Sequence, residues 1–169
     1  MLGYLKTVYG AKPLIGAEIG VFEGEHAAQT MKLLNMQQFY LVDSYETHVA
    51  RSKIYSKSDM EKILGSVEKR FSDCPQVHIF RQKSLEFAEY ARKKDFKFDF
   101  VYIDACHEYD AVLADIKAYY PLIRVGGVLG GHDFSGNFLG VVKAVVDFVS
   151  ERGLTPIIYV PDWWLIKEG

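Results

Sequence analysis

Cysteine is scarce in this chain of 169 residues, which contains only Cys74 and Cys106. The two thiols form neither a C-x-x-C pair nor the dense framework that staples small secreted domains. We therefore expect free thiols in a reducing compartment and infer a cytoplasmic protein. The N-terminus lacks a basic stretch followed by an apolar run, and no window approaches the roughly 18 apolar residues of a membrane span. Neither a removable signal nor a membrane partner is expected.

An excess of either charge is also absent. Lys and Arg total 20 and Asp and Glu total 22, so the formal net charge is −2. Proteins that bind nucleic acid or anionic membranes usually carry a basic stripe, which this balance does not favour. We therefore expect a small-molecule partner and no nucleic acid. Linkers, low-complexity segments and repeats are missing too, so the chain is expected to form a single domain over residues 1–169.

What the chain does contain is an alternation of short apolar runs and segments of helical periodicity. The apolar runs predict strands at residues 13–21, 37–45, 77–82, 97–104, 125–134, 155–160 and 163–168. Helical spacing predicts helices at residues 24–35, 58–71, 84–94, 109–120 and 137–153. Ser58 and Glu61 have the spacing of a capping box and would begin the second of these helices.

Strands that alternate with helices are typical of a mostly parallel sheet covered on both faces. The last two strands are joined by the short turn at Pro161 and Asp162, which predicts an antiparallel hairpin at one edge. The predicted fold is therefore a doubly wound α/β domain with a seven-stranded sheet. In such sheets ligands bind beyond the carboxyl ends of the strands, so the residues that end each strand are the first candidates for a site.

The first strand ends in EIGVFEG, where Glu18, Gly20 and Gly24 form an E-x-G-x-x-x-G pattern. This pattern differs from the G-x-G-x-x-G of nicotinamide binders, because Phe22 occupies the position of the second glycine. A nucleoside without a pyrophosphate suits it better. The second strand ends at Asp43, a place from which a carboxylate can bind ribose hydroxyls.

The third strand leads to Ser84, which would border an adenine or would simply cap its own helix. Both interpretations of Ser84 stay open on the sequence. For Asp43 the structural alternative is a surface acid at a strand end.

The chain resembles the class I S-adenosylmethionine-dependent methyltransferases in EIGVFEG, LVDSY, the run FDFVYIDACHEYDAVLADIKAYYPLIRVGGVLGGHDF and the closing hairpin. The likeness is greatest to the small-molecule O-methyltransferases, including the macrocin-type sugar enzymes and cephalosporin-hydroxylase-like proteins. It implies a Rossmann-like fold and S-adenosyl-L-methionine as cofactor. By this resemblance Glu18, Gly20 and Gly24, with Phe22 in the same loop, would surround the methionine part, Asp43 would bind ribose and Ser84 would border adenine.

The same resemblance makes the fourth and fifth strands neighbours, so that Asp104 would lie beside His132 and Asp133. Two carboxylates suit Mg²⁺, whereas an imidazole ligand favours Mn²⁺, Fe²⁺ or Zn²⁺. We therefore predict a divalent metal site at Asp104, His132 and Asp133, with Mg²⁺ or Mn²⁺ as the ion. Without a metal, the two acids would be helix caps or cofactor contacts and His132 a hydrogen-bond donor.

His107 follows Asp104 by three residues and resembles the general base of metal-dependent sugar O-methyltransferases. An alcohol needs a base or a metal to become nucleophilic at neutral pH, and imidazole has a suitable pKa. Asp104 and His107 are therefore the predicted catalytic pair. The alternative for His107 is a solvated ring at a helix N-terminus. The remaining histidines, His26, His48 and His78, have no acid at ligand spacing.

The polar segment 45–59 is expected to be either a lid over the substrates or a solvated loop. The predicted reaction is metal-assisted O-methylation of a small molecule or a sugar, with His107 as base. A nicotinamide-dependent oxidoreductase and a non-catalytic nucleoside-binding module are the alternatives. The acceptor is not specified by the sequence, and a homo-oligomer is left open.

Overall fold

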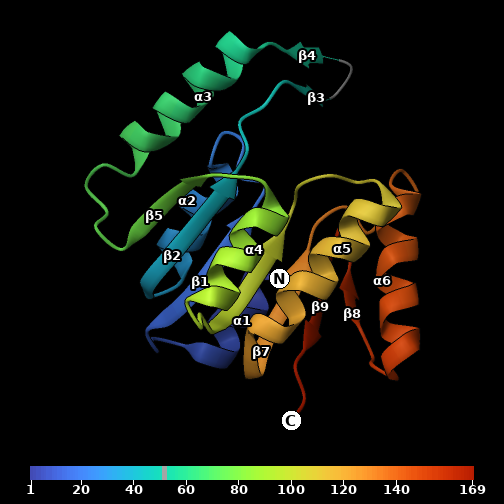
Figure 1. The fold of residues 1–169 in the computed structure, drawn as a ribbon. Coiled ribbons are helices and arrows are strands. Elements are labelled where there is room, and N and C mark those ends of the chain that lie inside the picture. Colours follow the sequence, from blue (N-terminus) through green and yellow to red (C-terminus); the bar gives the residue numbers. More distant parts are fainter. Residues whose placement is uncertain (51–52) are drawn as a thin grey trace.

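The structure is a computed structural model that describes residues 1–50 and 53–169, without the side chains of residues 48–50 (Figure 1). Its helices are α1 (Leu2–Tyr9), α2 (Glu25–Leu33), α3 (Lys57–Arg70), α4 (Ser84–Lys93), α5 (Tyr109–Tyr119), the short 3₁₀-helix η1 (Tyr120–Leu122) and α6 (Leu139–Arg152). Its strands are β1 (Leu14–Ile19), β2 (Met36–Asp43), β3 (His48–Ala50), β4 (Lys53–Tyr55), β5 (Val77–Arg81), β6 (Phe98–Ile103), β7 (Ile123–Gly131), β8 (Ile157–Tyr159) and β9 (Asp162–Ile166).

The main sheet has seven strands in the order β5-β2-β1-β6-β7-β9-β8. The pairs among β5, β2, β1, β6 and β7 are parallel. The pairs β7–β9 and β8–β9 are antiparallel. The predicted doubly wound sheet with an antiparallel edge hairpin is therefore confirmed.

Helices cover both faces of this sheet (Figure 1). Residues of α4, α5 and α6 pack on one face together with Trp163, and residues of α1, α2 and the end of α3 pack on the other together with Trp164. The central strand β6 is buried along its whole length, as expected for a parallel strand that is covered on both sides.

Three local features differ from the sequence-based prediction. Helix α1 and the small β3–β4 hairpin were not predicted, because the first is a short helix with one buried residue and the second is a pair of three-residue strands. The capping box predicted at Ser58 and Glu61 is wrong. Ser56 and Asp59 form it instead, since the Asp59 amide donates to the Ser56 hydroxyl and the Ser56 amide donates to the Asp59 carboxylate. Glu61 pairs with Arg81 of β5.

Among the described residues, no helix combines the length and the apolarity that are needed to cross a membrane.

The ends of β1 and β6 approach each other closely at Gly20. The Asp104 amide donates to the Ile19 carbonyl at 2.7 Å, and the Gly20 amide donates to the Val42 carbonyl at 2.8 Å. Gly20 has φ +87°, and a Cβ atom built on it would lie 2.0 Å from the Asp104 carbonyl oxygen. Only glycine meets both conditions, so this residue sets how closely the loop after β1 can lie to Asp104.

We predict that Gly20→Ala destabilises the fold by about 3 kcal/mol or more, because a backbone clash adds to an unfavourable φ. Gly65→Ala is the matched control, since Gly65 lies within α3 and nothing lies within 4 Å of a Cβ atom there. That control should gain up to about 1 kcal/mol from helix propensity. Urea unfolding of the two variants measures the difference, and equal stabilities would contradict the prediction.

Candidate functional site

The site lies where the parallel strands β6 and β7 end side by side. Ile103 pairs with Gly131 at the last position of their ladder, and the His132 amide donates to the Ile103 carbonyl at 3.1 Å. Asp104 and Asp133 therefore emerge at the same edge of the sheet. Asp133 has φ +62°, an unusual backbone conformation for a residue that is not glycine.

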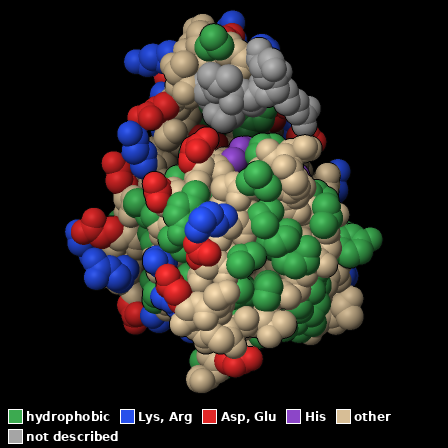
Figure 2. Space-filling model, turned by 90° about the vertical axis from the view of Figure 1, so that its right-hand side faces the viewer, with side chains coloured by type: hydrophobic (Ala, Val, Ile, Leu, Met, Phe, Trp, Pro, Cys, Tyr) green, Lys and Arg blue, Asp and Glu red, His purple; other side chains and the backbone are tan. Residues whose placement is uncertain are grey.

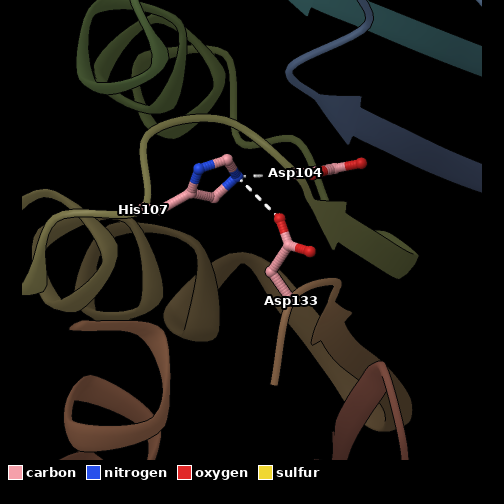
Figure 3. A group of neighbouring side chains, drawn as sticks. All are labelled: Asp104, His107 and Asp133. Atoms are coloured by element: carbon pink, nitrogen blue, oxygen red, sulfur yellow. Dashed lines mark ion pairs between the residues drawn. The ribbon is translucent and has the colours of Figure 1, made fainter. Parts of the chain in front are cut away.

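His107 brings an imidazole to these two carboxylates (Figure 3). Its Nε2 atom lies 2.8 Å from Oδ2 of Asp133 and 3.9 Å from Oδ1 of Asp104. Asp104 and Asp133 are close together, as the sequence predicted, and His107 from the loop before α5 lies with them. The Asp104 carboxylate, and with it the charge of Asp133, raises the pKa of His107, while partial burial of the ring opposes this effect.

The geometry of this cluster suits a divalent cation. The three donor atoms of Asp104, His107 and Asp133 all lie within 4.8 Å of one another. Nε2 of His107 is buried, and no described group meets it in hydrogen-bond geometry, although Asp133 lies within ion-pair distance. A buried ring nitrogen that faces two carboxylates without a hydrogen bond is a suitable metal ligand. The residues present therefore fit the predicted metal.

His132 lies on the other side of Asp133. Its Nδ1 atom is 2.9 Å from Oδ1 of Asp133, so the two oxygens of this carboxylate face two different imidazoles. In the described structure His132 is outside the group of three donors that meet within metal-binding distance. The sequence predicted His132 as a metal ligand and His107 as a base, whereas the structure groups His107 with the two carboxylates. Both roles stay predictions.

The position of His107 depends on a close approach by α6. A Cβ atom at Gly140 would lie 2.4 Å from the His107 carbonyl oxygen, so the first turn of α6 can rest on this loop only with glycine there. The His107 ring packs against Phe138 with ring centroids 4.5 Å apart. His107 also lines a small cavity of about 10 Å³, which has room for about one water molecule.

Asp43 holds the loop that follows β1. Its Oδ2 atom accepts hydrogen bonds from the amides of Val21 and Phe22 at 3.0 and 2.9 Å, and its Oδ1 atom accepts one from the Tyr45 amide at 2.8 Å. Phe22 has φ +49°, so it adopts a glycine-like conformation without being glycine. A carboxylate has about four acceptor positions, so Asp43 still has capacity for the predicted ribose contact.

Glu18 is fully buried and pairs with His26, for which the sequence suggested no partner. Nδ1 of His26 lies 2.8 Å from Oε2 of Glu18, and the His26 ring stacks on Tyr102 with centroids 3.9 Å apart. Burial raises the pKa of Glu18, and the hydrogen bond with His26 lowers it. The eight-residue separation hid this pair, because it joins β1 to the first turn of α2 across Gly20 and Gly24.

Ser84 is not the cap of α4, because Lys83 occupies the N-cap position. Its hydroxyl donates to Oδ1 of Asp115 in α5, and its carbonyl accepts a hydrogen bond from the Tyr119 hydroxyl at 2.7 Å. Burial raises the pKa of Asp115 to about 6. The Ser84 side chain is therefore engaged with α5, and its predicted contact with adenine is untested.

A polar cleft of about 690 Å³ opens between residues 44–47 and residues 81–83. Its volume lies in the range of small-molecule sites. It lies next to Asp43 and Ser84, the two residues predicted to contact the nucleoside. Gln82 lines this cleft, and its Oε1 atom is buried with no hydrogen-bond partner among the described residues. Sequence reasoning missed Gln82, because a lone Gln between Arg and Lys gives no motif.

The structure describes only part of the predicted lid, residues 45–59. Arg51 lies outside the described residues, as does the side chain of His48. Tyr45 is buried and packs with Met60 and Leu64 of α3, so it belongs to the core. The Tyr55 ring meets the Phe22 ring edge-on at 5.1 Å, which places β4 against the loop after β1. A lid function stays a prediction.

Comparison with known proteins points to one family. The sequence model of a family described as "Methyltransferase domain" matches residues 17–134, which include every residue predicted for the site. No curated protein matches the chain.

Similar solved structures share the fold at low sequence identity. An rRNA methylase from Streptococcus thermophilus is 17% identical with a TM-score of 0.70, over 99% of this chain and 94% of that one. CalS11, a TDP-rhamnose 3′-O-methyltransferase of calicheamicin biosynthesis, is 14% identical with a TM-score of 0.65, over 98% and 77%. The mycinamycin-pathway methyltransferase MycE, solved with Mg and SAH, is 15% identical with a TM-score of 0.64, over 98% and 49%.

The Ser84–Asp115 contact predicts a pH-dependent stability. The pKa of the Asp115 carboxyl is higher in the folded state, about 6, than its ordinary value of 3.8. The folded chain therefore binds this proton more tightly, and stability falls as the pH rises through this interval, by on the order of 3 kcal/mol. Asp115→Asn keeps the acceptor for Ser84 and cannot ionise. It should match the wild type near pH 4 and be more stable at about pH 8.

Thermal unfolding across this pH range measures the effect. Asp110→Asn, at an exposed acid in the same helix, is the control and should leave the pH profile unchanged. An Asp115→Asn variant that is less stable than the wild type at alkaline pH would refute the assignment of the raised pKa.

Proposed function

The chain belongs to the methyltransferase-domain family and is an S-adenosylmethionine-dependent enzyme, and from this premise we propose that it methylates a hydroxyl group of a small molecule or a sugar. The observation that carries the proposal is the meeting of Asp104, His107 and Asp133 at the ends of β6 and β7. A neutral hydroxyl must lose its proton as it attacks a methyl carbon. A cluster of two carboxylates and an imidazole is suited to promote that loss.

The cofactor supplies a methyl group that its sulfonium already activates. The remaining work of the protein is to bind this cofactor, to align it with the acceptor and to exclude water. We assign binding of the methionine part to Glu18 and to the loop of Gly20, Phe22 and Gly24. Asp43 fixes that loop through the Val21 and Phe22 amides and is assigned to the ribose. Ser84 borders the adenine end.

Metal assistance is part of the proposal. Asp104, His107 and Asp133 would hold a divalent cation, which would lower the pKa of the acceptor hydroxyl. The two carboxylates suit Mg²⁺, and the imidazole shifts the preference toward Mn²⁺. Nε2 of His107 cannot hold a metal and accept a proton at once. His107 as base, with Asp104, His132 and Asp133 as the ligands, is therefore the competing assignment.

A small-molecule acceptor is favoured over a nucleic acid by the charge balance, because the net charge is −2 and phosphate backbones are bound by excess Lys and Arg. The similar structures include both a sugar O-methyltransferase and an rRNA methylase, so they do not decide between the two classes. The match to the methyltransferase-domain family disfavours the alternative of a nicotinamide-dependent oxidoreductase. A cytoplasmic location accords with the two free cysteines.

We predict that chelator-treated protein binds S-adenosylhomocysteine and that the complex then binds Mn²⁺ more tightly than Mg²⁺. Asp133→Asn should abolish the metal isotherm, because it removes a charged ligand, and Asp110→Asn should leave it unchanged. Titration calorimetry measures both steps. His107→Ala separates the two assignments: if His107 is a ligand, metal binding and methyl transfer are both lost, whereas if it is the base, only methyl transfer is lost.

Each negative result has a defined meaning. Absence of nucleoside binding would sink the assignment of the cofactor residues. Nucleoside binding without a metal isotherm would remove the metal and leave Asp104, His107 and Asp133 as a proton-accepting group. Methylation of RNA but not of alcohols, phenols or sugars would reject the acceptor class. Full cofactor binding without turnover on any of these would support a non-catalytic module.

We also predict that the Gln82 side chain turns toward the cleft and recognises the 6-amino group of adenine through Oε1, which has no hydrogen-bond partner among the described residues. Gln82→Leu should weaken S-adenosylhomocysteine binding about ten-fold, the value of one hydrogen bond to a buried acceptor. S-inosylhomocysteine lacks the amino group, so the wild type should bind it more weakly than S-adenosylhomocysteine. The wild type and Gln82→Leu should bind S-inosylhomocysteine about equally. Glu86→Gln, at an exposed residue that lines the same cleft, is the control. Equal discrimination between the two nucleosides by wild type and Gln82→Leu would contradict this role.

A further inference from the structure

The strand β8 forms an open edge of the main sheet. It pairs with β9 on one side and is the last strand in the sheet order. Within the described residues, no strand covers its outer side. Open edges are usually protected by charged side chains, but the segment 155–160 reads TPIIYV and carries no charge. The edge is short and flanked by Pro156 and Pro161, which limits backbone pairing, so its exposed apolar side chains are the feature that favours a partner.

Apolar side chains extend from this edge onto α6. Ile158 pairs with Trp163, which faces the α6 side of the sheet, so Ile158 lies on that side as well. Leu139 and Val146 are exposed on α6 itself. Figure 2 shows hydrophobic side chains gathered on the face of the molecule that carries α6 and β8. Ile157 pairs with Trp164, so Ile157 and Tyr159 lie on the opposite side of this edge strand. We call the exposed apolar residues along this open edge and on α6 the apolar face: Leu139, Val146, Ile157, Ile158, Tyr159 and Val160.

The apolar face is large enough to form the centre of an interface, but it does not by itself make a whole interface. Its members are 38% to 75% exposed, Tyr159 most of all. Side chains of this kind at such exposures present on the order of 100 Å² each, so the six present several hundred Å². A standard protein interface buries about 800 Å² on each partner, and its centre is apolar. The face therefore supplies the apolar centre of an interface, and neighbouring polar residues such as Lys143 and Asp147 would supply its rim.

We propose that the apolar face binds a second copy of this chain through a two-fold axis. A self-complementary contact places the same patch on both partners, and an edge strand can lie antiparallel to its own copy. The apolar residues offer nothing to a strongly charged partner, while the Lys143–Asp147 ion pair places both signs beside Leu139 and Val146 on α6. Pro156 and Pro161 flank β8 and confine strand pairing to its three residues, so side-chain burial carries most of the association.

Oligomeric state is the direct readout. The Phe134 amide donates to the Pro161 carbonyl at 2.9 Å, so the hairpin turn touches the loop that carries Asp133. A substitution in this hairpin could therefore change activity either by disturbing the loop of Asp133 or by breaking the dimer. The molecular mass in solution reports the association alone.

Sedimentation equilibrium on the whole chain at micromolar concentrations tests the proposal. The wild type is expected to be a dimer, and Tyr159→Lys and Val160→Lys are expected to be monomers. These side chains are 75% and 64% exposed, so the substitutions do not disturb the core. Ile54→Lys is the matched control, because Ile54 is 71% exposed on β4 at the far end of the molecule and should leave the dimer intact (Figure 1).

A monomeric wild type would overturn the proposal, as would a dimer that persists in both β8 variants or assemblies that grow beyond two copies. Far-UV circular dichroism of each variant confirms folding independently of cofactor binding. If S-adenosylhomocysteine binding fails in a dimeric protein, the proposed function is at fault and the interface stands.

Discussion

The backbone contact between Gly20 and Asp104 is the constraint on which the site depends. It allows the turn after β1 to lie directly over the end of β6, because a side chain at Gly20 would overlap the Asp104 carbonyl. The loop after β1, which we propose binds the cofactor, and the Asp104–His107–Asp133 cluster consequently lie next to each other. The proposed transfer requires this, because a methyl donor and its acceptor must be close. Gly140 does the same on the other side, where it lets α6 rest on the His107 backbone.

Polar side chains then fix the loops that the glycines bring together. Asp43 accepts hydrogen bonds from Val21 and Phe22, and this compensates for the positive φ of Phe22, which otherwise costs conformational energy. Glu18 joins β1 to α2 through His26, and Ser84 joins α4 to α5 through Asp115. Each predicted cofactor residue with a side chain that can hydrogen bond thus also has a structural partner. A substitution at any of them will affect stability as well as binding.

The sequence predicts the edge of the sheet at which the candidate site lies, because one apolar run ends at Gly20, others end in Asp43, Asp104 and Asp133, and parallel strands end together. It does not predict contacts between side chains that are distant in sequence. The Glu18–His26 pair and the open Oε1 of Gln82 depend on the packing of several elements. Helix α1 was missed because a single buried residue, Leu5, gives no periodic pattern. The family resemblance names His107 and His132 as site residues, and their roles stay predictions. It does not predict how the two rings are arranged around Asp133, because that arrangement depends on the packing of the loops.

The arrangement around Asp133 sets a requirement for positive charge. Asp104 and Asp133 bring two negative charges to one edge, and among the described residues neither forms an ion pair with a Lys or an Arg. Among the described residues, the groups that form ion-pair contacts with the Asp133 carboxylate are the imidazoles of His107 and His132, one at each oxygen. If His107 is protonated, its proton does not lie in line with either carboxylate, so the buried Nε2 gains attraction without a hydrogen bond. A divalent cation among the same three atoms would satisfy the nitrogen and both acids together, which is the physical reason to prefer a metal-bound cluster over an isolated base.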